Sequence, residues 1–233
     1  TGALMATARF VLKMLPGIER PAICTSIPSM VNDHVHMLDL GANVDTTEEH
    51  LYQFALMGSL LASVINDQEA PKVALLNIGE EAIKGNEQIR NAAPLLEADK
   101  QLNYIGFVEG DGIFFDDVDV IVSDGFVGNV ALKTMEGTAK MITRHLERAF
   151  RRNLFTKLSA VMAKPVLADL KEGLDPRKHN GASLLGLRGI VVKSHGNADA
   201  VSFENAIGIA ARLVEQDILT KMAAQFVRQK DEE

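Results

Sequence analysis

The sequence predicts an α/β fold in which a largely parallel sheet is flanked by helices. Short apolar or β-branched runs alternate along the chain with longer segments of helical period, and this alternation is typical of βα units. The run at residues 118–123 is almost entirely apolar, as strands buried on both faces are. Several runs end in loops of Gly and short polar residues, which are the residues that tight connections use.

The apolar runs predict six strands, at residues 22–25, 34–40, 72–78, 104–108, 118–123 and 188–193. The segments of helical period predict six helices, at residues 2–15, 48–65, 80–96, 128–151, 154–170 and 202–228. In the second of these helices Leu51, Phe54 and Leu61 belong to one apolar face. A stretch with Gly, Pro and Asn at residues 171–181 is typical of a linker.

The domain organisation follows from the order of these elements. Two helices meet near Asn153 without a strand between them, which predicts a projecting helical hairpin over residues 130–172. We otherwise expect a single α/β domain over residues 1–233. The sequence does not begin with Met, so either residues have been removed from it or it is expected to be a piece of a longer protein.

Composition excludes several classes of protein. The chain has 24 Lys and Arg against 31 Asp and Glu, and this net charge of −7 argues against nucleic acid as the main partner. An apolar content of 47% is far from that of disordered chains. Cys24 is the only cysteine, so no intrachain disulfide is expected, and no metal-ligand spacing links it to the histidines. No bilayer-spanning or signal segment is recognisable, which predicts a cytoplasmic protein.

Four of the predicted strands run into Gly-containing polar loops, after residues 40, 78, 123 and 193. In a parallel sheet such loops gather at the edge formed by the carboxyl ends of the strands, where ligands of open α/β folds bind. Glycines and helix N-termini present backbone N–H groups to anions, so the loops predict an anion site. Positive charge would come from Lys84, Lys193 and His195, and orienting amides from Asn43, Asn77 and Asn129.

The same loop residues are also compatible with a purely structural role. Tight turns use Gly and Asn whether or not they bind a ligand, and the i, i+4 spacing of Glu80 and Lys84 suits a surface ion pair on a helix. No loop has the dinucleotide fingerprint or the Walker pattern.

The predicted hairpin concentrates positive charge. Between Lys140 and Lys164 there are seven basic residues and one acid, a local charge of +6. The basic residues lie opposite an apolar face and include Arg144, Arg148, Arg151 and Arg152, while the next helix carries Phe155, Leu158 and Met162. A cationic flank beside an apolar tip is typical of an interfacial element, so the hairpin is expected to contact an anionic membrane or an acidic protein. A solvated helix face and a contact with a second subunit are the alternatives.

With these residues identified, the chain resembles the bacterial acyl-carrier-protein:phosphate acyltransferases of phospholipid synthesis. The resemblance runs from end to end, and its distinctive stretches are LDLGANVD at 38–45, VALLNIGEE at 73–81, SDGFVGNVALKT at 123–134, LLGLRG at 184–189 and KSHG at 193–196. The family's N-terminal region, with its Gly-rich first strand loop, would lie upstream of Thr1, so the resemblance implies that this chain is the C-terminal part of a longer protein.

The resemblance implies transfer of a fatty acyl group from acyl carrier protein to inorganic phosphate, which gives acyl phosphate. It also implies a phosphotransacetylase-like (isocitrate-dehydrogenase-like) fold, a homodimer and peripheral association with the cytoplasmic membrane. No metal or redox cofactor is called for. A phosphate acetyl- or butyryltransferase using coenzyme A, a nicotinamide-dependent hydroxyacid dehydrogenase and a non-catalytic membrane-docked scaffold are the alternatives.

A mechanism follows as a hypothesis. Phosphate is held by backbone amides of the loops at 124–129 and 194–197, which include Gly125, Gly128 and Gly196, and its oxygen attacks the thioester carbonyl without a covalent acyl-enzyme. The expected catalytic residues are Asp124, Lys193, Ser194 and His195.

Overall fold

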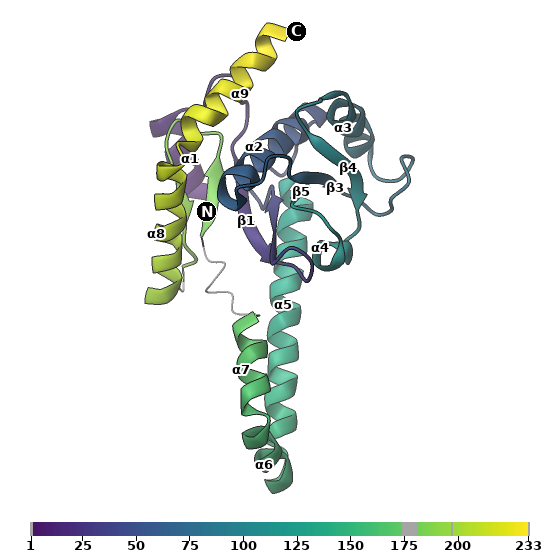
Figure 1. The fold of residues 1–233 in the computed structure, drawn as a ribbon, viewed down its shortest axis with the longest axis vertical. Helices are drawn as coiled ribbons and strands as arrows, with labels where there is room; N and C mark the ends of the chain where they lie inside the picture. Colours follow the sequence, from purple (N-terminus) through teal and green to yellow (C-terminus); the bar gives the residue numbers. More distant parts are fainter. Residues whose placement is uncertain (1, 174–180, 197, 233) are drawn as a thin grey trace. The chain divides into compact units, whose positions relative to one another are not determined.

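The computed structural model describes residues 2–173, 181–196 and 198–232, and the side chains of residues 171–173 and 228–232 are left out of the description (Figure 1). The linker predicted at 171–181 therefore lies almost entirely outside the described residues, and so does Asn197 of the loop at 194–197. The chain divides into two units, one of Thr1–Asn129 with Arg177–Glu233 and the other of Val130–Pro176.

The first unit is built on a seven-stranded mixed sheet of order β4-β3-β5-β2-β1-β6-β7. The strands are β1 Ala22–Pro28, β2 His34–Leu38, β3 Lys72–Leu76, β4 Asn103–Val108, β5 Val120–Val122, β6 Ala182–Leu185 and β7 Val192–Lys193. Strands β4, β3, β5 and β2 are parallel, whereas β1, β6 and β7 join the sheet through antiparallel pairs. The predicted α/β class is confirmed, with a sheet more mixed than expected. Strand β6 was not predicted, and the run at 188–193 contributes only the two residues of β7.

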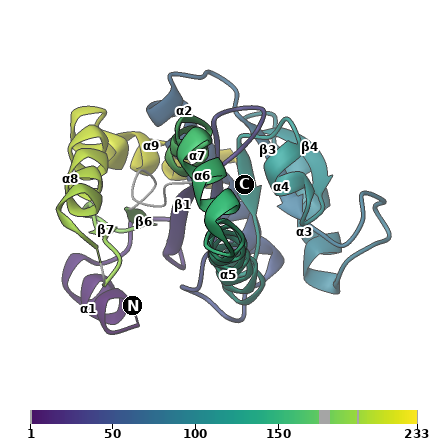
Figure 2. The ribbon, with the colours of Figure 1, turned by 90° about the horizontal axis from the view of Figure 1, so that it is seen from below.

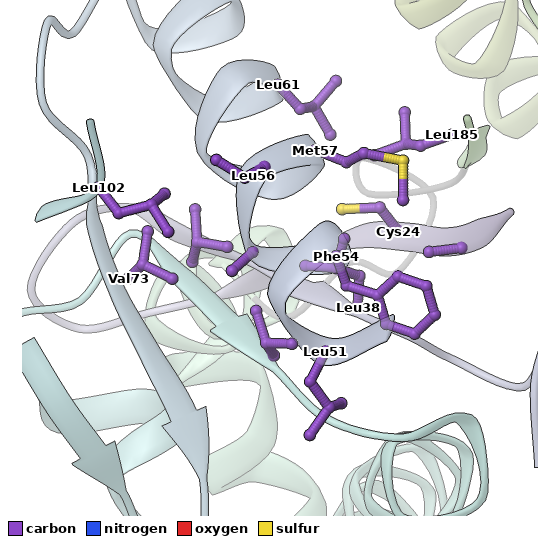
Figure 3. Packing of buried hydrophobic residues seen from close by; sticks show 14 of the residues in the cluster. Cys24, Leu38, Leu51, Phe54, Leu56, Met57, Leu61, Val73, Leu102 and Leu185 are labelled. Carbon is purple, nitrogen blue, oxygen red and sulfur yellow. The ribbon is translucent and has the colours of Figure 1, made fainter. Parts of the chain in front are cut away.

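Helix α2 (Glu48–Asn66) lies directly on the sheet and fills its core. A Cβ on Gly58 would lie 2.7 Å from Val120 and 2.8 Å from Leu38, so only glycine lets the helix approach these strands so closely. Phe54, Met57 and their buried neighbours pack there against residues of several strands (Figure 3). The apolar face predicted for this helix is the one that it buries.

Two of the predicted helices of the first unit have different bounds, each for a local reason. The helix expected from residue 80 is α3 (Glu87–Ala98), which begins only where the Asn86 side chain accepts from the amide of Ile89. The helix expected at 202–228 is two helices, α8 (Ala200–Glu215) and α9 (Ile218–Glu232). They are separated at Asp217, whose φ of 51° is left-handed. Helices α1 (Gly2–Leu12) and α4 (Gly112–Phe115) complete the first unit.

The second unit is helical. Helix α5 (Gly125–Phe150) begins in the first unit and continues into the second, where α6 (Leu154–Met162) and α7 (Lys164–Gly173) follow. Within this unit α7 runs back beside α5 (Figures 1 and 2). The single helix predicted at 154–170 is wrong because the chain breaks at Ala163, just before Pro165 in the first turn of α7. Proline lacks the amide that a continuous helix needs but suits a first turn.

Candidate functional site

Three of the four predicted loops gather at one edge of the sheet. Strands β2, β5 and β3 are parallel neighbours, so their carboxyl ends lead into the loops at 39–45, 123–124 and 77–86 on the same side. We call these segments, with the first turn of α5 up to Asn129, the three-loop edge. It contains seven of the predicted site residues, namely Asn43, Asn77, Lys84, Asp124, Gly125, Gly128 and Asn129.

The fourth loop points elsewhere, and the expectation that it joins the others is wrong. Three successive antiparallel pairs, β2 with β1, β1 with β6 and β6 with β7, reverse the direction of β7 relative to β2. The carboxyl end of β7 therefore faces the opposite edge of the sheet, and with it Lys193, Ser194, His195 and Gly196. Lys193 and Ser194 are half-buried, whereas His195 and Gly196 are exposed.

A buried carboxylate organises the three-loop edge. Asp39 has no exposed surface, and its Oδ1 accepts from the amides of Ile23 and Ala42 at 2.9 and 3.0 Å. Its Oδ2 accepts from the amide and the side-chain Nδ2 of Asn43 at 2.6 and 2.9 Å. Burial raises the pKa of this carboxyl, while these four hydrogen bonds act to lower the pKa. Asp39 thus joins β1 to the loop after β2 and serves a structural role.

The N-terminus of α5 has no unpaired amide in its first four residues. The amide of Gly125 donates to the Asn43 carbonyl at 2.8 Å, and that of Gly128 donates to the Asp124 carbonyl at 2.9 Å. The amides of Phe126 and Val127 both donate to Asp124 Oδ1 at 2.9 Å. Asp124 is therefore the cap of this helix, and the donors that a phosphate would use here already have partners inside the chain.

Gly125 and Gly128 let this helix pack against the loop after β2. A Cβ on Gly125 would come closer than 3.0 Å to the backbone of Asn43, and one on Gly128 would do so to the carbonyl oxygen of Asp39. Close packing of backbone on backbone thus accounts for both glycines without a ligand.

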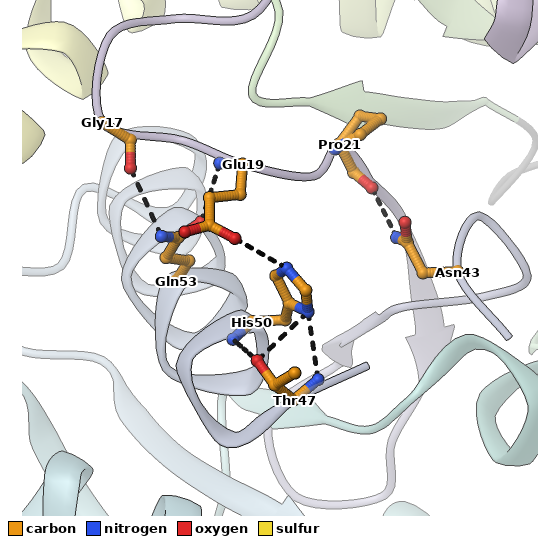
Figure 4. A network of polar contacts seen from close by, with 7 residues as sticks. All are labelled: Gly17, Glu19, Pro21, Asn43, Thr47, His50 and Gln53. Carbon is orange, nitrogen blue, oxygen red and sulfur yellow. Dashed lines mark hydrogen bonds and ion pairs between the residues drawn. The ribbon is translucent and has the colours of Figure 1, made fainter. Parts of the chain in front are cut away.

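Two of the predicted asparagines are also bound to the chain. Asn43 is buried, and its Nδ2 donates to the Pro21 carbonyl at 2.7 Å (Figure 4). Asn77 is buried as well: its Oδ1 accepts from the amide of Ile78 at 2.9 Å, and its Nδ2 donates to the Lys84 carbonyl at 3.3 Å. Their amides hold the loops at 39–45 and 77–86 in shape.

Lys84 and Asn129 are the exposed predicted residues of this edge. Lys84 lies in the loop before α3 and not on a helix, so the helical spacing that would pair it with Glu80 does not exist. Asn129 stands beside Gly41, where φ is +106°, and a Cβ on that glycine would lie 3.4 Å from the asparagine side chain. Among the predicted site residues of this edge, these two therefore have side chains that are open to a ligand.

A polar network that sequence reasoning missed supports the same edge. His50 lies in the first turn of α2, where its Nδ1 accepts from the amide of Thr47 at 3.0 Å and its Nε2 donates to Glu19 Oε2 at 3.1 Å (Figure 4). The imidazole replaces the Glu or Gln of an ordinary capping box. Thr47 three residues before His50 was the signal that could have found it. The network ties the segment that ends at Pro21 to the start of α2.

The second unit carries the predicted contact residues on exposed surface. Arg144, Arg148, Arg151 and Arg152 are exposed along the end of α5 and the turn that follows. Helix α6 buries none of its residues, and Leu154, Phe155, Leu158 and Met162 are each more than 60% exposed. Cationic and apolar side chains therefore adjoin at the turn between α5 and α6.

Two other kinds of feature are absent from the described residues. No cluster of three or more His, Cys, Asp or Glu side chains among them is arranged to hold a metal ion. None of the helices in this part of the chain is both long and apolar enough to cross a membrane.

Comparison with known proteins gives a consistent result. The model of a family described as "Fatty acid synthesis protein" matches residues 1–221. A protein of Methylococcus capsulatus named phosphate acyltransferase is 60% identical over 218 residues, which cover 94% of this chain and 64% of that protein. One of Halorhodospira halophila with the same name is 55% identical over 228 residues, 98% of this chain and 66% of that protein. The chain thus spans about two thirds of the length of these curated relatives.

Solved structures support the fold. The EutD phosphotransacetylase from Staphylococcus aureus matches 88% of this chain and 57% of its own at a TM-score of 0.55 and 17% identity. A branched-chain phosphotransacylase from Enterococcus faecalis matches 88% of this chain and 68% of its own at a TM-score of 0.54 and 14% identity. The predicted phosphotransacetylase-like fold is confirmed.

Proposed function

Because this chain belongs to the family of fatty acid synthesis proteins, we propose that it takes part in the transfer of a fatty acyl group from acyl carrier protein to inorganic phosphate. The observation that carries the proposal is its identity of 53–60% to relatives named phosphate acyltransferase. The product would be an acyl phosphate for phospholipid synthesis.

The three-loop edge is the proposed phosphate site. Its scaffold is held by Asp39, Asn43 and Asp124 through the hydrogen bonds described above, which leaves Lys84 and Asn129 to bind phosphate through their side chains. An oxygen of the phosphate attacks the thioester carbonyl carbon and forms the new carbon–oxygen bond. The carbon–sulfur bond breaks, and the carrier sulfur leaves as a thiolate with the electron pair of that bond and takes up the proton that the phosphate releases. Positioning and charge stabilisation are the contributions required of the protein.

The roles proposed for Lys193, Ser194, His195 and Gly196 need a separate test. Their loop belongs to the opposite edge of the sheet from Lys84 and Asn129. If all of these residues act on one substrate, the loop after β7 and the three-loop edge contact that substrate from different sides. Substitutions in the two loops therefore distinguish two positions for phosphate.

The proposed activity is tested in a protein of the relatives' length. We define the hybrid as this chain completed with the third of the Halorhodospira halophila relative that it does not match. The hybrid is expected to form acyl phosphate from acyl carrier protein thioesters and phosphate. Equal or faster reaction with the coenzyme A thioester of acetate or butyrate would replace the proposal with the coenzyme A alternative, and no turnover with either would favour a scaffold.

The second unit is proposed to dock on an acidic surface. Its segment from Lys140 to Lys164 has seven basic residues against one acid, a local charge of +6, and the exposed apolar residues of α6 adjoin them. This combination supports peripheral contact with an anionic membrane at the cytoplasmic face or with the acidic carrier protein. The same apolar residues support a homodimer through this unit.

A further inference from the structure

Helix α1 is an apolar helix that the described structure hardly covers. Of its 11 residues Arg9 alone is charged and Ala8 alone is buried. Phe10 is 76% exposed and Val11 65%. A helix this short is not stable in water by itself and needs a surface to pack against.

Backbone hydrogen bonds hold the chain that follows the C-terminal end of α1. The amide of Leu15 donates to the carbonyl of Gly186 at 2.9 Å, and the amide of Arg188 donates to the carbonyl of Lys13 at 3.0 Å. These bonds attach the chain after α1 to the segment between β6 and β7. Most side chains of the helix itself are exposed, whereas Ala8 is buried and Met5 and Leu12 are half-buried.

Helix α8 has a second apolar stripe beside the one it buries. Ala206 and Leu213 are buried, while Phe203, Ile207 and Val214 are 56%, 57% and 64% exposed. Spacings of four and seven residues place these three on one line along the helix. An exposed line of one aromatic and two β-branched side chains is unusual on a helix face that only solvent contacts.

Both helices lie at the end of the sheet formed by β6 and β7, away from β4 (Figures 1 and 2). Strand β7 is two residues long and is the last strand of the sheet. Its outer edge thus has no strand partner among the described residues. Exposed edges are usually covered by another element.

We propose that α1, the stripe of α8 and the outer edge of β7 form one surface that is covered by the part of the protein this chain does not span. About a third of the length of the Methylococcus capsulatus and Halorhodospira halophila relatives has no counterpart here, enough for several further elements. The surface is apolar and poor in charge, as contacts inside a domain are. This inference is independent of the proposed acyl transfer.

Hydrogen exchange tests the proposal. Amides of α1 are expected to exchange roughly 100-fold more slowly in the hybrid than in the 233-residue chain, because covered helices open less often. The natural Halorhodospira halophila relative, whose match includes 98% of this chain, provides the same measurement in a protein that does not depend on the hybrid folding.

Matched variants provide a second readout. Phe10→Asp and Ile207→Asp are expected to lower the Tm of the hybrid by about 5 °C or more, since each places a charge in a covered apolar contact. In the 233-residue chain they are expected to change the Tm little. Phe115→Asp, on α4 and 66% exposed, is the control, with the same effect in both proteins.

Two outcomes would overturn the proposal. The first is equally fast exchange of α1 in the chain, the hybrid and the natural relative. The second is slow exchange of α1 in the 233-residue chain when light scattering shows a dimer, because a second copy then covers the surface.

Discussion

The polar residues of the three-loop edge bind mainly to the chain itself. Asp39 accepts four hydrogen bonds, Asp124 caps α5, and the amides of Asn43 and Asn77 hold their loops. Residue types that suggest a ligand site in the sequence are thus used first to build the loops. Of the predicted site residues at this edge, Lys84 and Asn129 have exposed side chains that can meet a ligand.

Substitutions at the two loop regions locate phosphate. In the hybrid, Lys84→Gln and Asn129→Ala are expected to raise the KM for phosphate roughly tenfold each, the loss of about one charge-assisted hydrogen bond, with unchanged Tm. Steady-state kinetics with varied phosphate measure this. If Ser194→Ala and His195→Ala alone reduce turnover while Lys84→Gln has no effect, phosphate lies at the opposite edge.

Two glycines of α5 are expected to be intolerant of a methyl group. Gly125→Ala and Gly128→Ala should each lower the free energy of unfolding by about 1–3 kcal/mol, because the new Cβ would lie closer than 3.0 Å to backbone atoms of the loop after β2. Gly137→Ala in the same helix, with nothing within 4 Å of its Cβ, should raise it by up to about 1 kcal/mol. Urea unfolding measures all three. Equal effects would contradict the packing argument.

A buried histidine predicts acid sensitivity. Burial, with a smaller contribution from His34, lowers the pKa of His36 to about 4, whereas an unfolded chain has a histidine pKa of about 6.5. Between these values the unfolded state binds a proton that the folded state does not, so stability is full above pH 6.5 and falls as the pH drops towards 4.

The pH dependence is checked by urea unfolding of the wild type and of His36→Leu. The wild type should lose stability more steeply between pH 6.5 and 4 than the variant. Burial of Asp39 acts in the opposite direction but is common to both proteins, so the difference in slope isolates His36. His145→Gln, at an exposed position, is the control and should keep the wild-type slope.

At the scale of elements, the start of α5 shows how a cap can be mistaken for a catalytic group. Its first four amides donate to Asp124 and to the Asn43 carbonyl. An acidic residue before a Gly-containing helix start is compatible with both roles, and the bound amides favour the cap.

Two substitutions of Asp124 separate these roles. Asp124→Asn keeps a side-chain oxygen that can accept from the helix amides, so it should preserve stability within a few tenths of a kcal/mol, whereas Asp124→Ala should cost about 1 kcal/mol. If Asp124 acts only as a helix cap, Asp124→Asn should also retain most of the hybrid's turnover. A large loss of turnover with normal stability would identify a catalytic carboxylate.

The helices were predicted accurately where apolar periodicity defines them and inaccurately at their first and last residues. The buried face of α2 follows from apolar spacing. The start of α3 at Asn86, the break at Ala163 and the left-handed Asp217 depend on one or two side chains each. Such capping details are weak signals in a single sequence.

At the scale of the whole molecule, charge is distributed unevenly between the two units. The chain has a net charge of −7, while the segment from Lys140 to Lys164 has +6. Repulsion within that segment is tolerated because its side chains are exposed to solvent. This separation of charge is the reason to expect an acidic partner for the second unit.

Charge reversal in the second unit tests this. Arg148→Glu with Arg151→Glu should weaken binding to vesicles that contain anionic lipid by at least tenfold, since each basic residue near such a surface contributes about 1 kcal/mol. Lys100→Glu with Lys221→Glu, exposed in the first unit, changes the net charge equally and should have little effect. Co-sedimentation at two salt concentrations measures both. Unchanged binding of the first variant, with lost binding to acyl carrier protein, would identify the carrier as the partner.

The sequence by itself determined the α/β class, the core face of α2, the order of most elements and the segregation of charge. These depend on residues close together in the chain, whose spacing is visible in the sequence. Only the tertiary structure decided that β7 runs against β2, which removes Ser194 and His195 from the three-loop edge. It also decided that the amides at the start of α5 are already bound. Strand direction and hydrogen-bond partners depend on contacts between segments that are distant in the chain, and the local periodicity of the sequence does not report such contacts.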